Sequence, residues 1–364
     1  MNRLRVGFFS IHNPYNRVNF SGVPYYMLQA LEAHPAVEVV VMGAHLRPLP
    51  GWAGRIQKKF RPRTPLDLAR VTEPEDLDLI LSVVSTRFVA EEAARMRAPV
   101  FHVTDATPAF LREVYGRDIP PQKDALEAEC LAHAAAAVYS SDYMAARALR
   151  EFPDLSPDRV HAFPFGLNLD DIPAAVPEKP PLDPLNLLFV GSDWQRKGGT
   201  LAVEVLDALR TRGVDATLTV MGNDAAGQLG HAHVRGLGFV DKNSREGRAL
   251  FARELSRAHL LLHPTRADCS AMVVAEANVY GCPVAVTDVG GIPSVMDPGR
   301  NGVLFDLTDG PEEIADAITA MTGDAETYRG LSRSSRRHYE EKLTWRTWAD
   351  TLLAIAPARR AGQG

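Results

Sequence analysis

Residues 186–211, NLLFVGSDWQRKGGTLAVEVLDALRT, join an apolar run to a basic turn with glycines and then to a helical pattern. The run Asn186–Val190 is short and apolar and ends at a glycine, which is typical of a buried strand. From Gly199 to Thr211 the apolar residues recur at intervals of three and four, as they do on one face of a helix. A buried strand, a turn and a helix are the first parts of a βαβ unit, so this stretch predicts a parallel sheet.

The same alternation runs through the rest of the chain. Further strands are expected at residues 6–10, 37–42, 79–84, 100–104, 136–140, 216–221, 234–240, 260–263, 284–287 and 303–305. Further helices are expected at residues 23–32, 88–96, 123–133, 143–150, 247–257, 271–280, 311–321, 326–341 and 345–355. This order predicts an α/β fold with two doubly wound parallel sheets.

A proline-rich stretch interrupts the alternation between residues 164 and 184, where six prolines disfavour a regular hydrogen-bonded ladder. We therefore expect an N-terminal domain (1–165), an interdomain linker (166–184), a second domain (185–342) and a C-terminal helix with a tail (343–364). That last helix either caps the second domain or crosses back to the first. Two such domains would form a cleft lined by the carboxyl ends of their strands.

The composition excludes several classes of protein. The 364 residues are 46% hydrophobic and 23% charged with a net charge of −5, which fits a two-domain globular protein and gives no general field for nucleic acid. Three widely spaced cysteines indicate neither a disulfide framework nor a zinc site. The apolar run near the N-terminus is too short for a signal peptide, so we expect none, and no apolar stretch reaches the ~18 residues that span a bilayer. We expect a cytoplasmic protein, which could contact the inner membrane only from its surface.

One segment favours such a surface contact. Residues 47–70 carry seven basic residues and a single acid, Asp67, and Trp52, Ile56 and Phe60 would share one face of a helix. The segment is either a basic amphipathic element for a membrane or an anionic acceptor, or a solvated loop with a helical turn packed on the core.

The turn after the strand at 186–190 is a candidate phosphate site. Arg196 and Lys197 form a cation pair between a strand end and a helix, and Gly198 lets the backbone come close to a ligand. Cations and free helix N–H groups are what a diphosphate requires. The alternative is an exposed basic turn with a glycine at the helix start.

Two acids follow in the second domain. A helix expected to begin near Ser270 would direct the free N–H groups of Ser270, Ala271 and Met272 into the cleft. Asp268 and Glu276 lie eight residues apart, roughly 12 Å at the helical rise. They could hold the two ends of one long ligand, with Asp268 near a sugar and Glu276 near a ribose. Alternatively, Asp268 caps the helix and Glu276 is a solvated residue, although its apolar neighbours make that awkward.

In these motifs the chain resembles the retaining glycosyltransferases of family 4, which have two Rossmann-like domains in the GT-B arrangement. Asp268 and Glu276 match the spacing of the family's Glu-x7-Glu motif, with Asp in the first place, and Arg196-Lys197-Gly198 is similar to its phosphate-binding turn. Further matches are residues 21–23, 164–168 and 289–305. The sequence departs from the family at Ser192, where many members have arginine, at Asp268, and at Ser270-Ala271 in place of Phe-Gly. These departures leave the donor sugar open.

The resemblance implies transfer from a nucleoside diphosphate sugar with retention of configuration, and no cofactor. With no Asp-x-Asp metal motif in evidence, we expect this transfer to be metal-independent. Arg196, Lys197 and the helix start at residues 270–272 would neutralise the leaving diphosphate. Gly22 would let backbone amides of the first domain approach the same group. His102 is similar to a histidine that contacts the donor sugar, unless it is a core histidine satisfied by backbone. Asp105 either orients the acceptor hydroxyl or caps the helix near residue 108, while His12 either lines the cleft or belongs to a turn.

Other functions remain to be separated from this one. No G-x-G-x-x-G follows either opening strand, which argues against a nicotinamide-dependent oxidoreductase. A nucleotide-sugar 2-epimerase of the same fold, a phosphorylase and a non-catalytic nucleotide-sugar-binding subunit are the remaining alternatives. The expected ligands are a UDP- or GDP-sugar donor and a glycan, lipid-linked or small-molecule acceptor, with no nucleic acid. The sequence fixes neither the sugar, nor the base, nor the acceptor.

Overall fold

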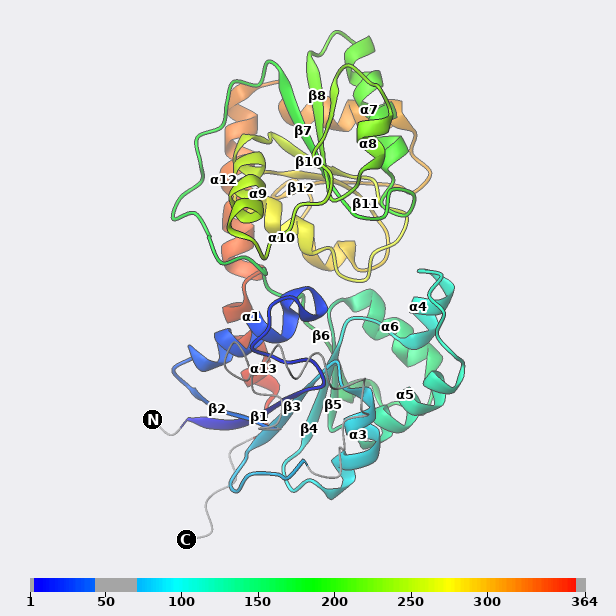
Figure 1. Ribbon diagram of the computed structural model, residues 1–364, viewed down its shortest axis with the longest axis vertical. Helices are drawn as coiled ribbons and strands as arrows, with labels where there is room; N and C mark the ends of the chain where they lie inside the picture. The colour runs from blue at the N-terminus through cyan, green and yellow to red at the C-terminus, as the bar shows by residue number, and fades with distance from the viewer. Residues whose placement is uncertain (1–2, 43–70, 358–364) are drawn as a thin grey trace, which may run out of the picture. The chain divides into compact units, whose positions relative to one another are not determined.

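The computed structural model describes residues 3–42 and 71–357. The chain divides into two compact units, each a parallel sheet flanked by helices (Figure 1). The first unit joins residues 1–166 to Trp345–Gly364, and the second is Leu167–Thr344.

The first unit contains a six-stranded sheet in the order β2-β1-β3-β4-β5-β6, with every pair of neighbours parallel. Its strands are β1 (Leu4–Ser10), β2 (Val37–Val41), β3 (Leu79–Val83), β4 (Val100–Thr104), β5 (Ala136–Tyr139) and β6 (Val160–Ala162). Its described helices are α1 (Val23–Glu32), α3 (Thr86–Glu92), α4 (Pro108–Glu113), α5 (Gln122–His133), α6 (Asp142–Glu151) and α13 (Trp345–Ile355). The short strand β6 was not predicted from the sequence.

The second unit repeats this plan with the order β12-β11-β10-β7-β8-β9, again parallel throughout. Its strands are β7 (Leu185–Val190), β8 (Ala216–Met221), β9 (Val234–Gly236), β10 (Leu260–His263), β11 (Val284–Thr287) and β12 (Gly302–Phe305). Its helices are α7 (Gly199–Thr211), α8 (Ala225–Gln228), α9 (Arg245–Arg257), α10 (Met272–Asn278), α11 (Pro311–Thr322) and α12 (Ala325–Lys342). The predicted α/β fold with two doubly wound parallel sheets is confirmed.

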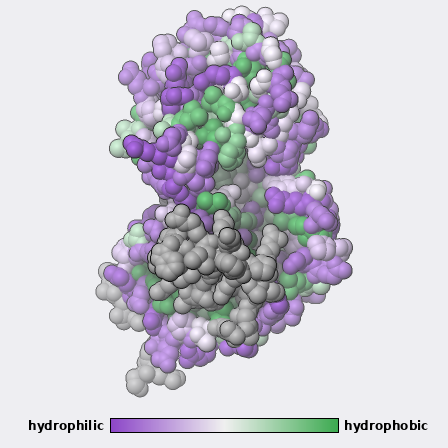
Figure 2. Space-filling view, viewed as in Figure 1, coloured by the Kyte–Doolittle hydropathy of each residue, from purple (hydrophilic) through white to green (hydrophobic). Residues whose placement is uncertain are grey.

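Apolar side chains on both faces of each sheet explain why the strands are apolar runs without polar alternation. In β7, Leu188 packs into the core on one face while Leu187 and Phe189 pack into the core on the other. On the second unit, hydrophobic side chains also gather at the surface in the face shown in Figure 2, surrounded by hydrophilic ones. Phe239, in the second unit, is 75% exposed.

Two local expectations differ from the structure, and the placement of the last helix, which the sequence left open, is decided by it. The strand predicted at 234–240 is only Val234–Gly236, because Gly238 has φ +64° and accepts the Gly222 N–H at 2.8 Å in an irregular loop. The helix expected near Ser270 begins at Met272. Helix α13 packs on α1 in the first unit, where the Trp348 side chain is buried.

The proline-rich residues 163–184 form neither a helix nor a strand. The basic segment 47–70, with the proposed face of Trp52, Ile56 and Phe60, lies outside the described residues. Within the described parts of the chain, no helix has the length and apolar character needed to span a bilayer.

Candidate active site

The order of the second sheet reverses between β7 and β10, with β8 and β9 on one side and β11 and β12 on the other. In open parallel sheets the carboxyl ends of the strands at such a point form a crevice for ligands. The loops that leave this point, residues 191–198 after β7 and 264–271 after β10, contain five of the seven site residues that the sequence singled out in the second unit.

Glycine 198 lets these two loops touch. It has φ +76°, a left-handed conformation, and a Cβ atom there would lie 1.9 Å from the carbonyl oxygen of Pro264. The loops are also tied by the Arg266 N–H, which donates to the Arg196 carbonyl at 2.7 Å. A glycine is therefore required at the start of α7 for backbone contact as well as for its φ angle.

Lys197 and Asp268 form an ion pair where the loops meet, with Nζ 2.5 Å from Oδ2. The two side chains are 15% and 7% exposed, and Nε2 of the fully buried His263 lies 3.4 Å from the same oxygen. Burial by itself raises the pKa of Asp268, but the Lys197 ammonium and His263 outweigh it and hold that pKa well below its usual range. Burial and the Lys197 charge lower the pKa of His263 to about 4, so its imidazole is neutral at pH 7.

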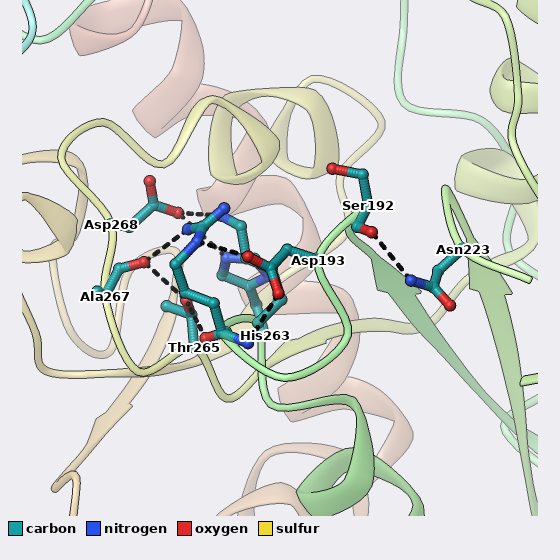
Figure 3. Close-up of polar contacts among 9 residues, drawn as sticks. Ser192, Asp193, Asn223, His263, Thr265, Ala267 and Asp268 are labelled. Carbon is teal, nitrogen blue, oxygen red and sulfur yellow. Dashed lines mark hydrogen bonds and ion pairs between the residues drawn. The ribbon is translucent and has the colours of Figure 1, made fainter. Parts of the chain in front are cut away.

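Arg196 lies on the same loop, but its guanidinium forms hydrogen bonds within the protein. Nε donates to Asp193 at 3.1 Å and Nη1 to the Ala267 carbonyl at 2.9 Å. Figure 3 shows Asp193, Ala267 and Asp268 close to one another, and a separate contact in which the Asn223 side chain donates to the Ser192 carbonyl. Of the two predicted cations, Lys197 therefore pairs with the carboxylate of Asp268, while Arg196 holds the loop in place.

The backbone of Asp268 is fixed by a pair of glycines in another loop. The Gly291 N–H donates to the Asp268 carbonyl at 2.8 Å, and a Cβ atom on Gly290, which has φ +58°, would lie 2.2 Å from that oxygen. The glycine pair after β11 thus sets the position of the acid.

Glu276 lies on α10, and its carboxylate is 4% exposed. It is ion-paired with Lys242, which lies in the loop between β9 and α9. Glu276 is therefore no solvated helix residue. Sequence reasoning missed Lys242, because nothing in the polar stretch 241–244 indicates which distant acid its side chain reaches.

Ser270 and Ala271, which were predicted to open the helix, precede α10. The Met272 N–H donates to the Ser270 carbonyl at 2.9 Å, so this backbone forms a turn, and Ala271 stands at the helix N-cap without a side-chain cap. The prediction that the helix begins near Ser270 is wrong by two residues. The amide groups of Ser270, Ala271 and Met272 nonetheless follow directly on Asp268.

In the first unit, Gly22, His12 and Asp105 lie in loops that follow the strands β1 and β4. Gly22 is the N-cap of α1 with φ +88°, and His12 is half-buried and stacks on Phe20 with ring centroids 5.9 Å apart. Burial lowers the pKa of His12. The alternative that Asp105 caps α4 is wrong, because the cap is the Thr107 hydroxyl, which accepts the Phe110 N–H at 3.2 Å.

His102 is not at a strand end. It lies within β4, beside Ser82 of β3, and none of its surface is exposed. Its Nε2 is 3.8 Å from Oε1 of Glu127 on α5, and neither ring nitrogen has a hydrogen-bond partner. A ring buried in this way cannot touch a donor sugar, so the predicted sugar contact is not available in this structure. The alternative of a ring satisfied by backbone is also wrong.

The expectation that the sequence contains no Asp-x-Asp triplet is wrong, because residues 76–78 are Asp76-Leu77-Asp78. It immediately precedes β3, and an Asp78 oxygen accepts the Arg5 N–H of β1 at 2.8 Å. Asp78 therefore lies near the amino ends of these strands, at the opposite edge of the sheet from His12 and Asp105. Its contact is structural.

Comparison with known proteins assigns the second unit to a family. The family model described as "Glycosyl transferases group 1" matches residues 184–324. Residues 184–324 form a group 1 glycosyltransferase domain. The predicted resemblance to family 4 glycosyltransferases is thereby confirmed, and the matched segment contains Lys197, Lys242, Asp268 and Glu276.

Relatives and solved structures extend this result. The chain is 28% identical over 184 residues to a D-inositol 3-phosphate glycosyltransferase of Paenarthrobacter aurescens, covering 48% of this chain and 45% of the relative. The chain thus spans about half the length of the curated relatives it matches. Sucrose-phosphate synthase of Thermosynechococcus elongatus superposes with a TM-score of 0.64 at 17% identity, covering 97% of this chain and 98% of that one.

A third similar structure is HepE of Anabaena in complex with UDP-glucose, with a TM-score of 0.57 at 15% identity, covering 96% of this chain and all of that chain. Similarity at this level of identity establishes the fold alone. The whole chain has the GT-B fold, as predicted.

Proposed function

We propose that the protein transfers a glycosyl group from a nucleoside diphosphate sugar to an acceptor hydroxyl, with retention of configuration and without a metal ion or cofactor. The observation that carries this proposal is the ion pair of Lys197 and Asp268 at the strand-order reversal of the group 1 domain. A phosphate-binding cation and a sugar-binding acid are there held in contact by two loops from neighbouring strands.

Lys197 neutralises the charge that develops on the leaving diphosphate. Its ammonium has three N–H donors, and the contact with Asp268 uses one direction, so donors remain for phosphate oxygens. The amide groups of Ser270 and Ala271 assist from the same edge of the sheet, whereas the Met272 N–H is already bonded to the Ser270 carbonyl. Arg196 keeps the loop in place through Asp193 and Ala267.

Asp268 accepts a hydroxyl hydrogen bond from the donor sugar. Its carboxylate stays ionised at neutral pH because its pKa is held well below the usual range. An ionised acceptor of this kind binds a sugar hydroxyl and cannot donate a proton, so it serves to position the sugar. Glu276, farther along the same segment, binds the ribose.

The acceptor binds the first unit, where Asp105 and His12 lie beyond the ends of β4 and β1. Its oxygen attacks the anomeric carbon from the face that the diphosphate leaves. The new carbon–oxygen bond forms as the bond to the phosphate oxygen breaks, and that oxygen takes the acceptor proton. No strong protein base is needed, and the neutral His12 is suited to a hydrogen bond with the acceptor.

The donor is a UDP- or GDP-sugar, and the acceptor is a glycan, a lipid-linked glycan or a small molecule. The UDP-glucose complex of HepE supports a nucleotide-sugar donor for a chain of this fold. The inositol phosphate in the name of the Paenarthrobacter relative supports a polyhydroxylated acceptor.

Titration calorimetry with UDP, GDP, ADP and their sugars, in the presence of EDTA, tests the donor site. We expect one nucleotide to bind in chelator and Lys197→Ala to weaken it at least tenfold, with Lys342→Ala on α12 as an exposed-lysine control. Undiminished binding by Lys197→Ala, or binding only when a divalent metal is added, would contradict the proposal.

Turnover separates transfer from the alternatives. A transferase releases nucleoside diphosphate only when an acceptor is present, and NMR of the product shows the anomeric configuration of the donor. A binding subunit releases none with any acceptor, and a nucleotide-sugar epimerase converts the donor to its epimer without an acceptor and without net release of nucleoside diphosphate.

A further inference from the structure

Lys242 belongs to the same edge of the second sheet as the donor site, although no motif includes it. It lies in the loop that follows β9, six residues beyond the strand's last residue, Gly236. The Asn243 N–H donates to Oδ1 of Asp241 at 2.9 Å, and the Ser244 N–H to the Asp241 carbonyl at 3.1 Å. Ser244 in turn caps α9, so the backbone of Lys242 is fixed on both sides.

The side chain of Lys242 reaches Glu276 and is then half open to solvent. Nζ contacts Oε1 of Glu276 and lies 5.1 Å from the ring centroid of Phe251, which supports the cation on one side. The lysine side chain is 40% exposed and the glutamate 4% exposed. The ion pair is therefore buried at the Glu276 carboxylate and reaches solvent through the Lys242 ammonium group.

The second unit thus has two lysine–acid pairs, and the two acids lie on one short segment of chain. Lys197 holds Asp268 and Lys242 holds Glu276, and the two acids are eight residues apart. The lysines come from the loops after β7 and β9, both at the carboxyl edge. A long ligand that meets the first pair with its sugar and diphosphate meets the second pair with its nucleoside.

We propose that Lys242 is a specificity-determining residue, which together with Glu276 recognises the cis-diol of the donor's ribose; this rests on the proposed function. Each ribose hydroxyl both donates and accepts a hydrogen bond. A carboxylate only accepts and an ammonium only donates, so the adjacent pair satisfies both capacities of the diol, which neither side chain does alone. The protein therefore selects ribonucleotides over 2′-deoxyribonucleotides, and Lys242 supplies part of that selection.

The test measures dissociation constants of UDP, GDP, their 2′-deoxy counterparts and inorganic pyrophosphate by calorimetry. For the wild type we expect the ribonucleotide to bind at least about tenfold more tightly than its deoxy form, since a hydrogen bond to a charged group is lost. Lys242→Met keeps the length of the side chain and removes its donors, and should bring the ratio to within about twofold. Pyrophosphate, which has no ribose, should bind the variant as it binds the wild type.

Matched variants keep the result interpretable. Lys342→Met, an exposed lysine of the same unit, should leave every constant unchanged. If Lys242→Met does not fold because Glu276 loses its partner, Lys242→Gln retains an uncharged amide donor group for that carboxylate and should still reduce the ratio at least threefold.

A ribose preference unchanged in both Lys242 variants would overturn the proposal, as would an equal loss of pyrophosphate and nucleotide affinity, which would make Lys242 a phosphate ligand. Those outcomes leave the proposed function intact when Lys197→Ala still weakens pyrophosphate binding. Failure of the wild type to bind any nucleotide would overturn both.

Discussion

Replacing Glu127 with glutamine should change how the stability of the first unit depends on pH. Glu127 lies on α5 with its side chain 3% exposed, and Oε2 accepts a hydrogen bond from Thr86 at 3.0 Å. Burial raises the pKa of Glu127 from 4.5 to about 7, the Thr86 hydrogen bond lowers it in part, and Glu151 and Asp124 add to the rise. Burial lowers the pKa of the adjacent His102 from 6.5 to about 4.

The two groups act on stability with opposite signs. Between pH 4.5 and 7 native Glu127 keeps a proton that the unfolded chain has lost, so stability falls as pH rises. Between pH 4 and 6.5 unfolded His102 binds a proton that the native ring does not, so stability rises with pH. Each shift of about 2.5 units corresponds to about 3 kcal/mol, and the two nearly cancel where their ranges overlap.

Glu127→Gln removes the titration of residue 127, so that of this pair only His102 still contributes to the pH dependence of stability. Relative to the wild type, the variant should therefore gain about 3 kcal/mol of unfolding free energy between pH 4.5 and pH 7.5. Hydrogen exchange of amides in β4 and α5, followed by mass spectrometry across this range, measures the free energy of opening of this unit. Glu129→Gln, on an exposed position of the same helix, is the control and should give a profile parallel to the wild type. Parallel profiles for Glu127→Gln and the wild type would refute the assignment of a raised pKa to the buried carboxyl.

The remaining predictions concern backbone strain, the C-terminal helix and the donor site. Gly198→Ala should destabilise the second unit by roughly 2–5 kcal/mol in denaturant unfolding, because a Cβ atom would lie 1.9 Å from a carbonyl oxygen of the neighbouring loop; Gly213→Ala, with φ +84° but open space, should cost only about 1–2 kcal/mol. Trp348→Ala should destabilise the first unit by roughly 3–5 kcal/mol, since this buried indole anchors α13 there. Asp268→Asn should weaken UDP-glucose about tenfold relative to UDP in calorimetry, while UDP alone binds at least as tightly because Lys197 is released from a carboxylate; equal losses for both ligands would contradict a sugar-binding role.

Much of the fold could be predicted because local pattern and tertiary structure agree. The bounds predicted for α1, α7 and α13 are those observed, since in each case an apolar face at helical spacing covers a core. The strand expected at 234–240 was too long because its glycines, not its apolar residues, decide the backbone path. Which unit receives α13 follows from side-chain packing over more than 300 residues of separation, as in the contact of His34 with Asp350 at 2.9 Å.

The site was predictable only where residues close in sequence carry it. The turn with Lys197 and the spacing of Asp268 and Glu276 are local features, and the strand order then brings the turn beside Asp268. The complete burial of His102 could not be predicted from the sequence. All five residues of β4 are buried, and an apolar run does not reveal which of its side chains lie beneath a helix. The partner of Glu276 was equally hidden, since a loop 34 residues away provides it.

The two lysine–acid pairs also answer a difficulty with acids at a diphosphate site. A carboxylate beside a phosphate repels it, and that repulsion is strong where the surroundings exclude water. Lys197 and Lys242 cancel the charges of Asp268 and Glu276, so the carboxylates can accept sugar and ribose hydroxyls without opposing the diphosphate. Because each lysine still has N–H donors to share, neutralisation of the acid and binding of the ligand are compatible. In the proposed donor site, the spacing of the two acids matches the distance from the sugar to the ribose of the donor, and the paired lysines remove the electrostatic obstacle to placing acids beside its diphosphate.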